Sequence, residues 1–346
     1  MRPELGATRP AREHGSSPYG RPVIKPPVWT PEIPAYFYAG GLAGASAGLG
    51  LLSDLRGEHA LARRAWALAL AGSIVSPALL ISDLGVPARF LHMLRMFKVT
   101  SPMSVGSWIL AGFGTATAPA AAHAFVGLGA PGRAAQVAAA LLGLPLSSYT
   151  GALVANTAVP VWHEARLELP FLFTAGAAAS AGAAATVLSP VREAQAARRL
   201  AVGGAVAEVA IDRLMRRRLR SRGVAGAYEE GMPKQLDRAA TALTAGGAAV
   251  VALRGGRSRG AAIAGGLLLS AGAVAERWAI FRGGASSAAR PQDTTGPQRS
   301  RIERGESRGA ARSHALQPAP AAHDGARPGM RPAPPGSPAI DAGPGA

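Results

Sequence analysis

The segment Leu169–Leu188 reads LPFLFTAGAAASAGAAATVL and contains no charged residue. An α-helix needs about 20 such residues to cross the hydrocarbon core of a bilayer. A helix on the surface of a soluble protein would carry a polar stripe at a period of 3.6 residues, whereas this segment is apolar all round. We therefore predict a transmembrane helix here, and an all-α, polytopic helix bundle as the fold of the chain.

The same pattern recurs along the middle of the chain, where apolar segments are separated by short connections that contain arginine. Counting one weak segment, Arg199–Met215, the sequence predicts about eight spans. They are Pro34–Ser53, Ala65–Ser82, Ser104–Leu128, Ala134–Ala155, Leu169–Leu188, Arg199–Met215, Ala239–Leu253 and Ala261–Phe281.

Composition divides the chain into three parts: a polar, proline-rich segment at 1–33, the helix bundle at 34–282, and a basic Pro/Gly/Ala-rich tail at 283–346. The tail holds too few large apolar residues to offset the entropy of ordering, so we predict disordered termini. Lys and Arg number 37 against 20 Asp and Glu. Their distribution between the loops predicts a multi-pass cell-membrane protein with cytoplasmic termini. We expect membrane lipid, and not nucleic acid, to attract this charge.

Several kinds of chemistry are excluded. The chain has no cysteine, so it cannot hold an iron–sulfur cluster through its own thiolates, form a disulfide or use a thiol nucleophile. Of seven histidines only His123 lies well inside a span, which leaves no pair of axial haem ligands. We find no P-loop, zincin or nucleophile-elbow motif. We therefore predict no haem, no metal site and no catalytic residue in this chain.

The most informative connection is Ser82–Trp108, which places an acid, basic residues and hydroxyls between two apolar helices. Its large apolar residues recur at helical spacing, which predicts a short amphipathic helix at the membrane interface. An aromatic, cation-bearing pocket at this depth would suit a quinone head, whose carbonyls need hydrogen-bond donors. Such a surface would equally suit the docking of a partner subunit. A third interpretation is that Ser82–Trp108 is an ordinary charged loop.

Parts of this connection, DLGVPARF at Asp83–Phe90 and KVTSPMSVGSW at Lys98–Trp108, resemble the signature of the NrfD/polysulfide reductase (PsrC-type) membrane subunits. Further segments similar to that family follow in the same order, and the resemblance covers roughly residues 29–290. They are Tyr149–Gly151 with Pro160–Trp162, Glu168–Phe173 and Glu276–Arg282.

The resemblance implies a membrane anchor and quinone-interacting subunit of a respiratory oxidoreductase complex. Such a subunit exchanges electrons between the quinone pool and a ferredoxin-like iron–sulfur subunit, usually with a molybdopterin oxidoreductase subunit as the catalytic partner. The implied cofactor is menaquinone or another exchangeable quinone. On this interpretation the chain is not a complete enzyme by itself.

Candidate quinone-binding residues are Tyr149, Arg89, His92 and Lys98. The resemblance implies a hydrogen-bond donor role for Tyr149. The three basic residues are either donors to quinone carbonyls or charges that dock a partner.

Candidate proton-transfer residues are Asp83, His163 and Glu208. Asp83 ends the second span and could instead form an ion pair with Arg89. His163 lies at a helix mouth. Glu208 lies inside the weak span, and acids within a membrane are costly and usually functional or paired.

Two alternatives remain open: a transporter or channel, which Glu208 and the glycine-rich spans would allow, and a purely structural anchor that binds no quinone. Two other features have structural interpretations. The run Arg213–Arg222 holds six arginines in ten residues, and we expect it to fix topology and attract anionic lipid. Tyr36 and Tyr38 begin the first span and are typical of an aromatic belt.

Overall fold

The computed structural model describes residues 22–303 and 305. Residues 1–21, 304 and 306–346 lie outside the described part, and with them most of the two segments predicted as disordered. The chain divides into two units, residues 1–300 and 301–346, and the helix bundle belongs to the first. The described residues of that unit form helices and no strands, which confirms the predicted all-α class.

Long helices make up the bundle, and shorter ones lie in the connections or, in one case, after the last long helix. The long helices are α1 Glu32–Leu55, α2 His59–Ser82, α3 Pro102–Val126, α4 Gly129–Ala155, α6 Leu169–Leu188, α7 Gln195–Ser221, α8 Gly231–Arg254 and α9 Arg259–Ala288. The shorter ones are the 3₁₀ helix η2 Pro87–Leu94, α5 Pro160–Glu164, the 3₁₀ helix η3 Ala225–Tyr228, and α10 Pro291–Glu303.

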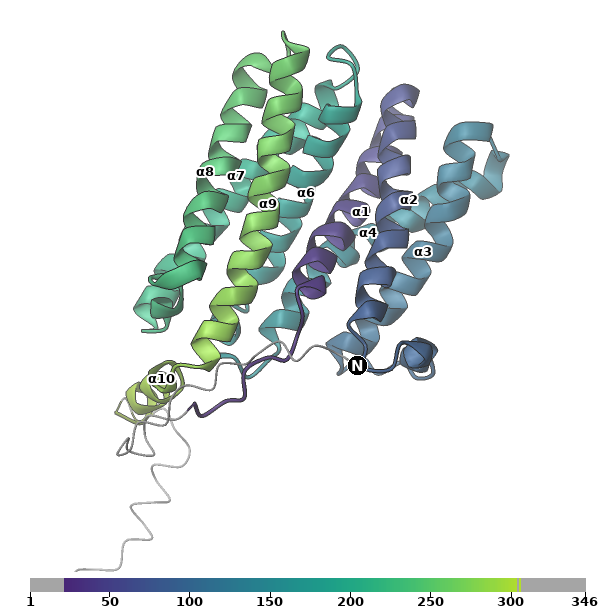
Figure 1. The fold of residues 1–346 in the computed structure, drawn as a ribbon. Coiled ribbons are helices and arrows are strands. Elements are labelled where there is room, and N and C mark those ends of the chain that lie inside the picture. Colours follow the sequence, from purple (N-terminus) through teal and green to yellow (C-terminus); the bar gives the residue numbers. More distant parts are fainter. Residues whose placement is uncertain (1–21, 304, 306–346) are drawn as a thin grey trace, which may run out of the picture. The chain divides into compact units, whose positions relative to one another are not determined.

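The long helices form two neighbouring groups, α1–α4 and α6–α9, which meet where α6 packs against α1 and α4 (Figure 1). Tight turns at 56–58, 127–128, 189–194 and 255–258 join helices at one end, here called the turn end. The longer connections, which contain η2, α5 and η3, lie at the opposite end, called the connector end.

Helix α7 corresponds to the weak predicted span. Seven helices in the described residues are long and apolar enough to cross a membrane, and α7 is not among them. Yet it has 27 residues, which corresponds to about 40 Å, and it packs against both α6 and α8. The bundle therefore contains eight long helices, in agreement with the prediction.

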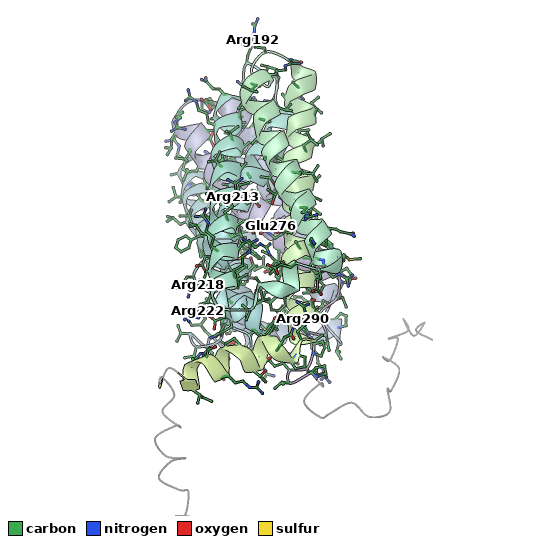
Figure 2. All side chains as sticks on the ribbon, turned by 90° about the vertical axis from the view of Figure 1, so that its left-hand side faces the viewer. Arg192, Arg213, Arg218, Arg222, Glu276 and Arg290 are labelled. Carbon is green, nitrogen blue, oxygen red and sulfur yellow. The ribbon has the colours of Figure 1, made fainter. Side chains whose placement is uncertain are left out.

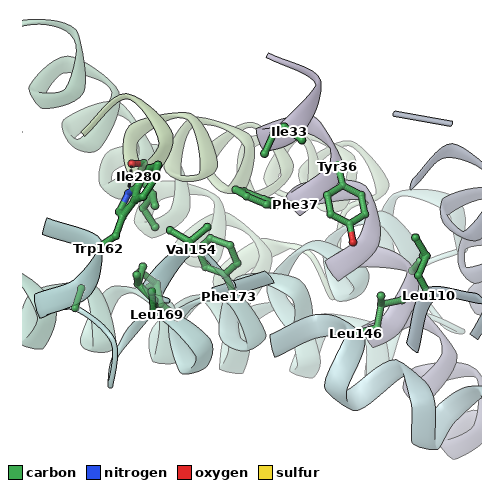
Figure 3. Packing of buried hydrophobic residues seen from close by; sticks show 14 of the residues in the cluster. Ile33, Tyr36, Phe37, Leu110, Leu146, Val154, Trp162, Leu169, Phe173 and Ile280 are labelled. Atoms are coloured by element: carbon green, nitrogen blue, oxygen red, sulfur yellow. Dashed lines mark hydrogen bonds between the residues drawn. The ribbon is translucent and has the colours of Figure 1, made fainter. Parts of the chain in front are cut away.

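Small residues allow the helices to approach closely. A Cβ atom added to Gly143 of α4 would lie 2.5 Å from the carbonyl oxygen of Gly44 in α1, which fixes how near these helices can run. Large side chains fill the space between the two groups, with the rings of Phe37 and Phe173 5.5 Å apart (Figure 3). The buried Trp162 donates from Nε1 to the carbonyl oxygen of Ile280 at 2.9 Å.

The last long helix passes the predicted boundary at 282 and ends at Ala288. Gly283 and Gly284 make this possible, because the rings of Tyr228 and Trp162 pack directly against them where side chains would clash. The change to a Gly/Ala/Ser composition at this point had indicated the start of the tail, but here it serves close packing.

Candidate functional site

A cavity of about 100 Å³ lies at the connector end of the α1–α4 group, and we call it the inner cavity. The segment before α1, the connector-end parts of α1–α4 and η2 all contribute to it. Its lining residues are Trp29, Ile33, Tyr36, Phe37, Leu80, Asp83, Leu84, Met93, Met103, Ser107, Tyr149 and Leu153. Two of the residues predicted from sequence, Tyr149 and Asp83, are therefore brought together.

The inner cavity is mostly apolar but contains two phenols. In the described structure the hydroxyl of Tyr149 makes no hydrogen bond, and its ring packs against Gly106 of α3. Tyr36 is 1% exposed, and its buried hydroxyl also lacks a hydrogen-bond partner. Buried polar groups usually have partners, so the unsatisfied Tyr36 hydroxyl, with a second phenol on the same small cavity, indicates a place for an acceptor.

Tyr36 is a residue that sequence reasoning missed, because an aromatic belt explained it. A signal was present: Tyr36 precedes Gly40 and Gly44 by four and eight residues, so all three share one helix face. The glycines mark the face of the helix on which another helix packs. Tyr36 lies on the same face, so its side chain points into the bundle.

Asp83 forms hydrogen bonds with Thr30 and not the ion pair with Arg89 that the sequence suggested. Its carboxylate accepts hydrogen bonds from the backbone N–H of Thr30, at 3.3 Å, and from the Thr30 hydroxyl. No ion pair joins it to Arg89 within the part of the chain that the structure describes. Asp83 thus ties the segment before α1 to the end of α2, and it stands on the wall of the inner cavity.

A second cavity, the outer groove, has a volume of about 300 Å³ and lies between α2, α3 and η2. Leu80, Met93 and Ser107 line both the inner cavity and the outer groove, so the two adjoin at these side chains. The other residues of the groove are largely apolar: Ser73, Pro77, Ile81, Phe90, Leu94, Leu110, Ala111, Gly114 and Thr115.

The predicted interfacial helix is present, but as a 3₁₀ helix. With three residues per turn, Phe90 and Met93 fall on the face toward the outer groove. The three basic candidates, Arg89, His92 and Lys98, are exposed and line neither cavity. The structure therefore separates them from Tyr149 and Asp83.

The remaining candidates lie elsewhere. His163 is exposed on α5. Glu208 is 3% exposed in the middle of α7, and neither of its buried carboxylate oxygens has a hydrogen-bond partner.

Glu208 belongs to a buried charged group with Glu276 and Arg277 of α9. Arg277 pairs with Glu276, donates from Nη2 to the carbonyl oxygen of Phe173 at 3.0 Å, and lies 4.1 Å from the Phe173 ring centroid. Glu208 and Arg277 both reach Gly176 of α6: a Cβ there would lie 2.5 Å from Glu208 Oε1 and 2.7 Å from Arg277 Nη2. With both acids ionised, this group would carry one net negative charge. An unbalanced charge inside a membrane is costly, and acids placed there are usually functional or paired.

Four of the six arginines in the run Arg213–Arg222 form ion pairs within the described part of the protein. Arg216 contacts Asp212 at 3.0 Å, pairs with Asp237 of α8, and stacks 3.6 Å from the centroid of the Tyr228 ring. Burial raises the pKa of Tyr228 well above its usual value, so the phenol stays neutral beneath the guanidinium. Three more pairs are Arg218–Glu168 at 3.2 Å, Arg220–Glu229 at 3.6 Å and Arg222–Glu164 at 3.7 Å. Figure 2 shows Arg218 and Arg222 toward the connector end. The basic run thus forms ion pairs that join α7 to α5, to α8 and to the residues next to α6 and η3. The sequence did not indicate this role.

The sequence profile of the NrfD_2 family, described as polysulfide reductase, matches residues 17–289. The chain belongs to this family. The match covers all eight long helices and every residue of the inner cavity, which confirms the resemblance first noticed in the loop between α2 and α3. No match is found among curated proteins. As an NrfD protein with several apolar helices, the chain is a multi-pass membrane protein of the polysulfide reductase type.

Proposed function

We propose that this NrfD protein is the quinone-interacting membrane anchor of a respiratory oxidoreductase complex, with the inner cavity as its quinone-head site. The observation that carries the proposal is the pair of phenols that line that cavity, Tyr36 and Tyr149. The buried Tyr36 hydroxyl has no hydrogen-bond partner within the described residues. A quinone head is a flat apolar ring with two carbonyl acceptors, so it needs apolar walls and donors. The inner cavity supplies both.

The adjoining outer groove fits the rest of such a molecule. Its walls are mainly aliphatic and aromatic, as an isoprenoid tail requires, and Met93 stands between groove and cavity. Methionine is flexible and adapts to irregular apolar ligands. The groove's volume of about 300 Å³ already reaches the lower limit of ordinary ligand pockets, roughly 300–1,000 Å³.

A bound menaquinone or related quinone would supply two-electron, two-proton redox chemistry at this place. We propose that Asp83, on the cavity wall at the connector end, exchanges protons there. His163 and Glu208 are further proposed proton-transfer residues. They lie apart from the inner cavity, so any role for them concerns proton movement elsewhere in the bundle.

We assign Arg89, His92 and Lys98 to docking, the other interpretation that their sequence allows. They are exposed at the connector end and outside both cavities. The proposed partners are a ferredoxin-like iron–sulfur subunit and a molybdopterin oxidoreductase subunit. Since the chain has no cysteine, a cluster for electron transfer has to come from a partner.

The transporter alternative has one observation in its favour, the buried carboxylate of Glu208. Transporters, however, commonly bind substrate where helices are interrupted near the membrane midplane. Each of the eight long helices here is continuous, including α2, α3 and α4, which contain Pro77, Pro119 and Pro145. The quinone interpretation therefore accounts for more of the observations.

Single substitutions test the proposal in the purified complex. Tyr149→Phe and Tyr36→Phe each remove one donor, and we expect each to raise the KM for quinone about three- to tenfold, the usual net worth of one hydrogen bond. Tyr38→Phe is the matched control, because Tyr38 lines neither cavity. His92→Ala should leave the KM unchanged.

A second pair of variants tests the position of the Tyr149 ring. Gly106→Ala places a methyl group against that ring and should weaken quinone binding, whereas Gly203→Ala on α7 meets nothing within 4 Å and serves as its control. If quinone kinetics are unchanged in assembled Tyr149→Phe, Tyr36→Phe and Gly106→Ala complexes, the inner cavity is not the site.

A further inference from the structure

A third cavity lies in the half of the bundle away from the inner cavity, and we call it the turn-end groove. It has a volume of about 570 Å³ and runs between α1, α4, α6 and α7. Gly44, Ala45, Gly48, Leu49, Leu52 and Leu144 form much of its floor and walls. Arg56, Glu58, Gln195 and Arg199 line its mouth at the turn end.

The length of the groove matches one leaflet of a bilayer. From Arg56 to Gly44 it follows twelve residues of α1, which correspond to roughly 18 Å at about 1.5 Å per residue. Half of a hydrocarbon core of about 30 Å is similar. A chain that enters at the mouth would thus end near the middle of the membrane.

The depth of the groove offers no free hydrogen-bond donor to a ligand. Two hydroxyls line it, but each is already used inside its own helix: Ser147 donates to the carbonyl oxygen of Gly143 at 2.9 Å, and Thr174 to that of Pro170 at 2.8 Å. A polar ring such as a quinone head would lose its hydrogen bonds there, whereas an acyl chain has none to lose.

The mouth has the opposite character. Arg56 and Arg199 are exposed and form no ion pair with any residue that the structure describes. Together with Glu58 they leave one net positive charge, which one phosphodiester neutralises. Arginine is well suited to phosphate, since its donors form a planar fork.

We propose that the turn-end groove binds one anionic phospholipid, with its phosphodiester between Arg56 and Arg199 and one acyl chain along the α1 glycines. The lipid joins α1 to α7, and so links the two helix groups from the side opposite the inner cavity. This site is independent of quinone binding.

Lipid retention by the full-length chain tests the proposal. The chain is purified in mild detergent from nanodiscs that contain equal parts of phosphatidylglycerol and phosphatidylcholine, and bound lipid is counted by native mass spectrometry. We expect one retained phosphatidylglycerol. Arg56→Gln with Arg199→Gln should lower its preference over phosphatidylcholine about thirtyfold, since each arginine near a lipid surface contributes about fivefold. The charge-matched control is Arg63→Gln with Arg257→Gln, two exposed arginines outside the groove.

A second variant tests the acyl-chain part. Gly48 lines the groove and a Cβ added to it meets nothing within 4 Å, so the larger side chain of Gly48→Leu enters the groove and should expel the lipid. Gly246→Leu, at an equally open position on α8, should not. Retention of phosphatidylglycerol by both groove variants overturns the proposal. Displacement of the lipid by inorganic phosphate alone would also overturn it, because it would reveal a site for the headgroup only. Release of quinone instead of lipid by Gly48→Leu would overturn it as well.

Discussion

Glu208 is a buried acid whose carboxylate has no hydrogen-bond partner among the described residues. Its carboxylate is buried, makes no hydrogen bond, and lies with Arg277 against Gly176, while Arg277 already pairs with Glu276. We predict that Glu208→Gln leaves assembly and thermal stability unchanged, because it removes an unpartnered charge. Proton uptake linked to quinone turnover should fall, by up to about a hundredfold if this acid is an obligatory proton carrier. The measurement is dye-reported proton uptake by the complex in liposomes, with the exposed Glu229→Gln as control. If the Glu208→Gln complex takes up protons at the normal rate, Glu208 is not a proton carrier and has a structural role only.

Single residues also show where sequence reasoning reached its limit. Tyr149 and Asp83, two of the candidates from sequence, line the inner cavity. Both could be found because they end or line spans whose positions depend on local hydrophobicity. Arg89 and His92 are outside it because η2 is a 3₁₀ helix, and three residues per turn rotate side chains differently from the α-helical spacing that was assumed. Tyr36 was missed because an aromatic belt explained its position, although its spacing from Gly40 and Gly44 places it on the packed face of α1.

At the scale of elements, α7 depends on the pairing of its arginines. Arg216 has a side chain only 11% exposed and holds both Asp212 and Asp237. We predict that Arg216→Met lowers the free energy of unfolding by about 3–5 kcal/mol, because two acids lose their partner in a buried setting. Arg217→Met is the control, as Arg217 is exposed and forms no ion pair in the described residues.

The readout is thermal unfolding in detergent, followed by tryptophan fluorescence. Replacing the acids as well, by Asp212→Leu and Asp237→Leu, should restore much of the loss, since apolar residues can substitute for a buried ion pair. Equal stability of Arg216→Met and Arg217→Met would show that the pairing contributes little.

The same helix explains why its span was predicted only weakly. Hydropathy averages count each arginine as a cost, yet apart from Asp212 the acids that pair with these arginines come from outside α7. They belong to α5, to α8, to the residue before α6 and to the residues around η3. Those partners depend on tertiary packing and cannot be found within the segment itself. The other seven spans needed no such partners, so local composition was enough to place them.

For the whole molecule, the alternation of helices assigns every connection to one of two ends, and this much could be predicted by counting spans. How the α1–α4 and α6–α9 groups meet could not, because close approaches such as Gly44 to Gly143 depend on backbone contacts between distant segments. The alternation has a functional consequence. It places η2, with its exposed basic residues and the exposed Met96 and Phe97, at the same end as the inner cavity.

A partner that docks at the connector end would therefore lie close to the proposed quinone head. We predict that Arg89→Glu, Arg95→Glu and Lys98→Glu together slow association of the iron–sulfur subunit about tenfold or more at low salt, because charge complementarity mainly governs encounter rates. Iron recovered per purified chain measures the outcome. The matched control reverses three exposed arginines at the turn end, Arg63, Arg254 and Arg257. Iron loss only in the connector-end variant would place the electron-transfer partner beside the inner cavity, whereas loss only in the turn-end variant would place it at the wrong end for the function proposed here.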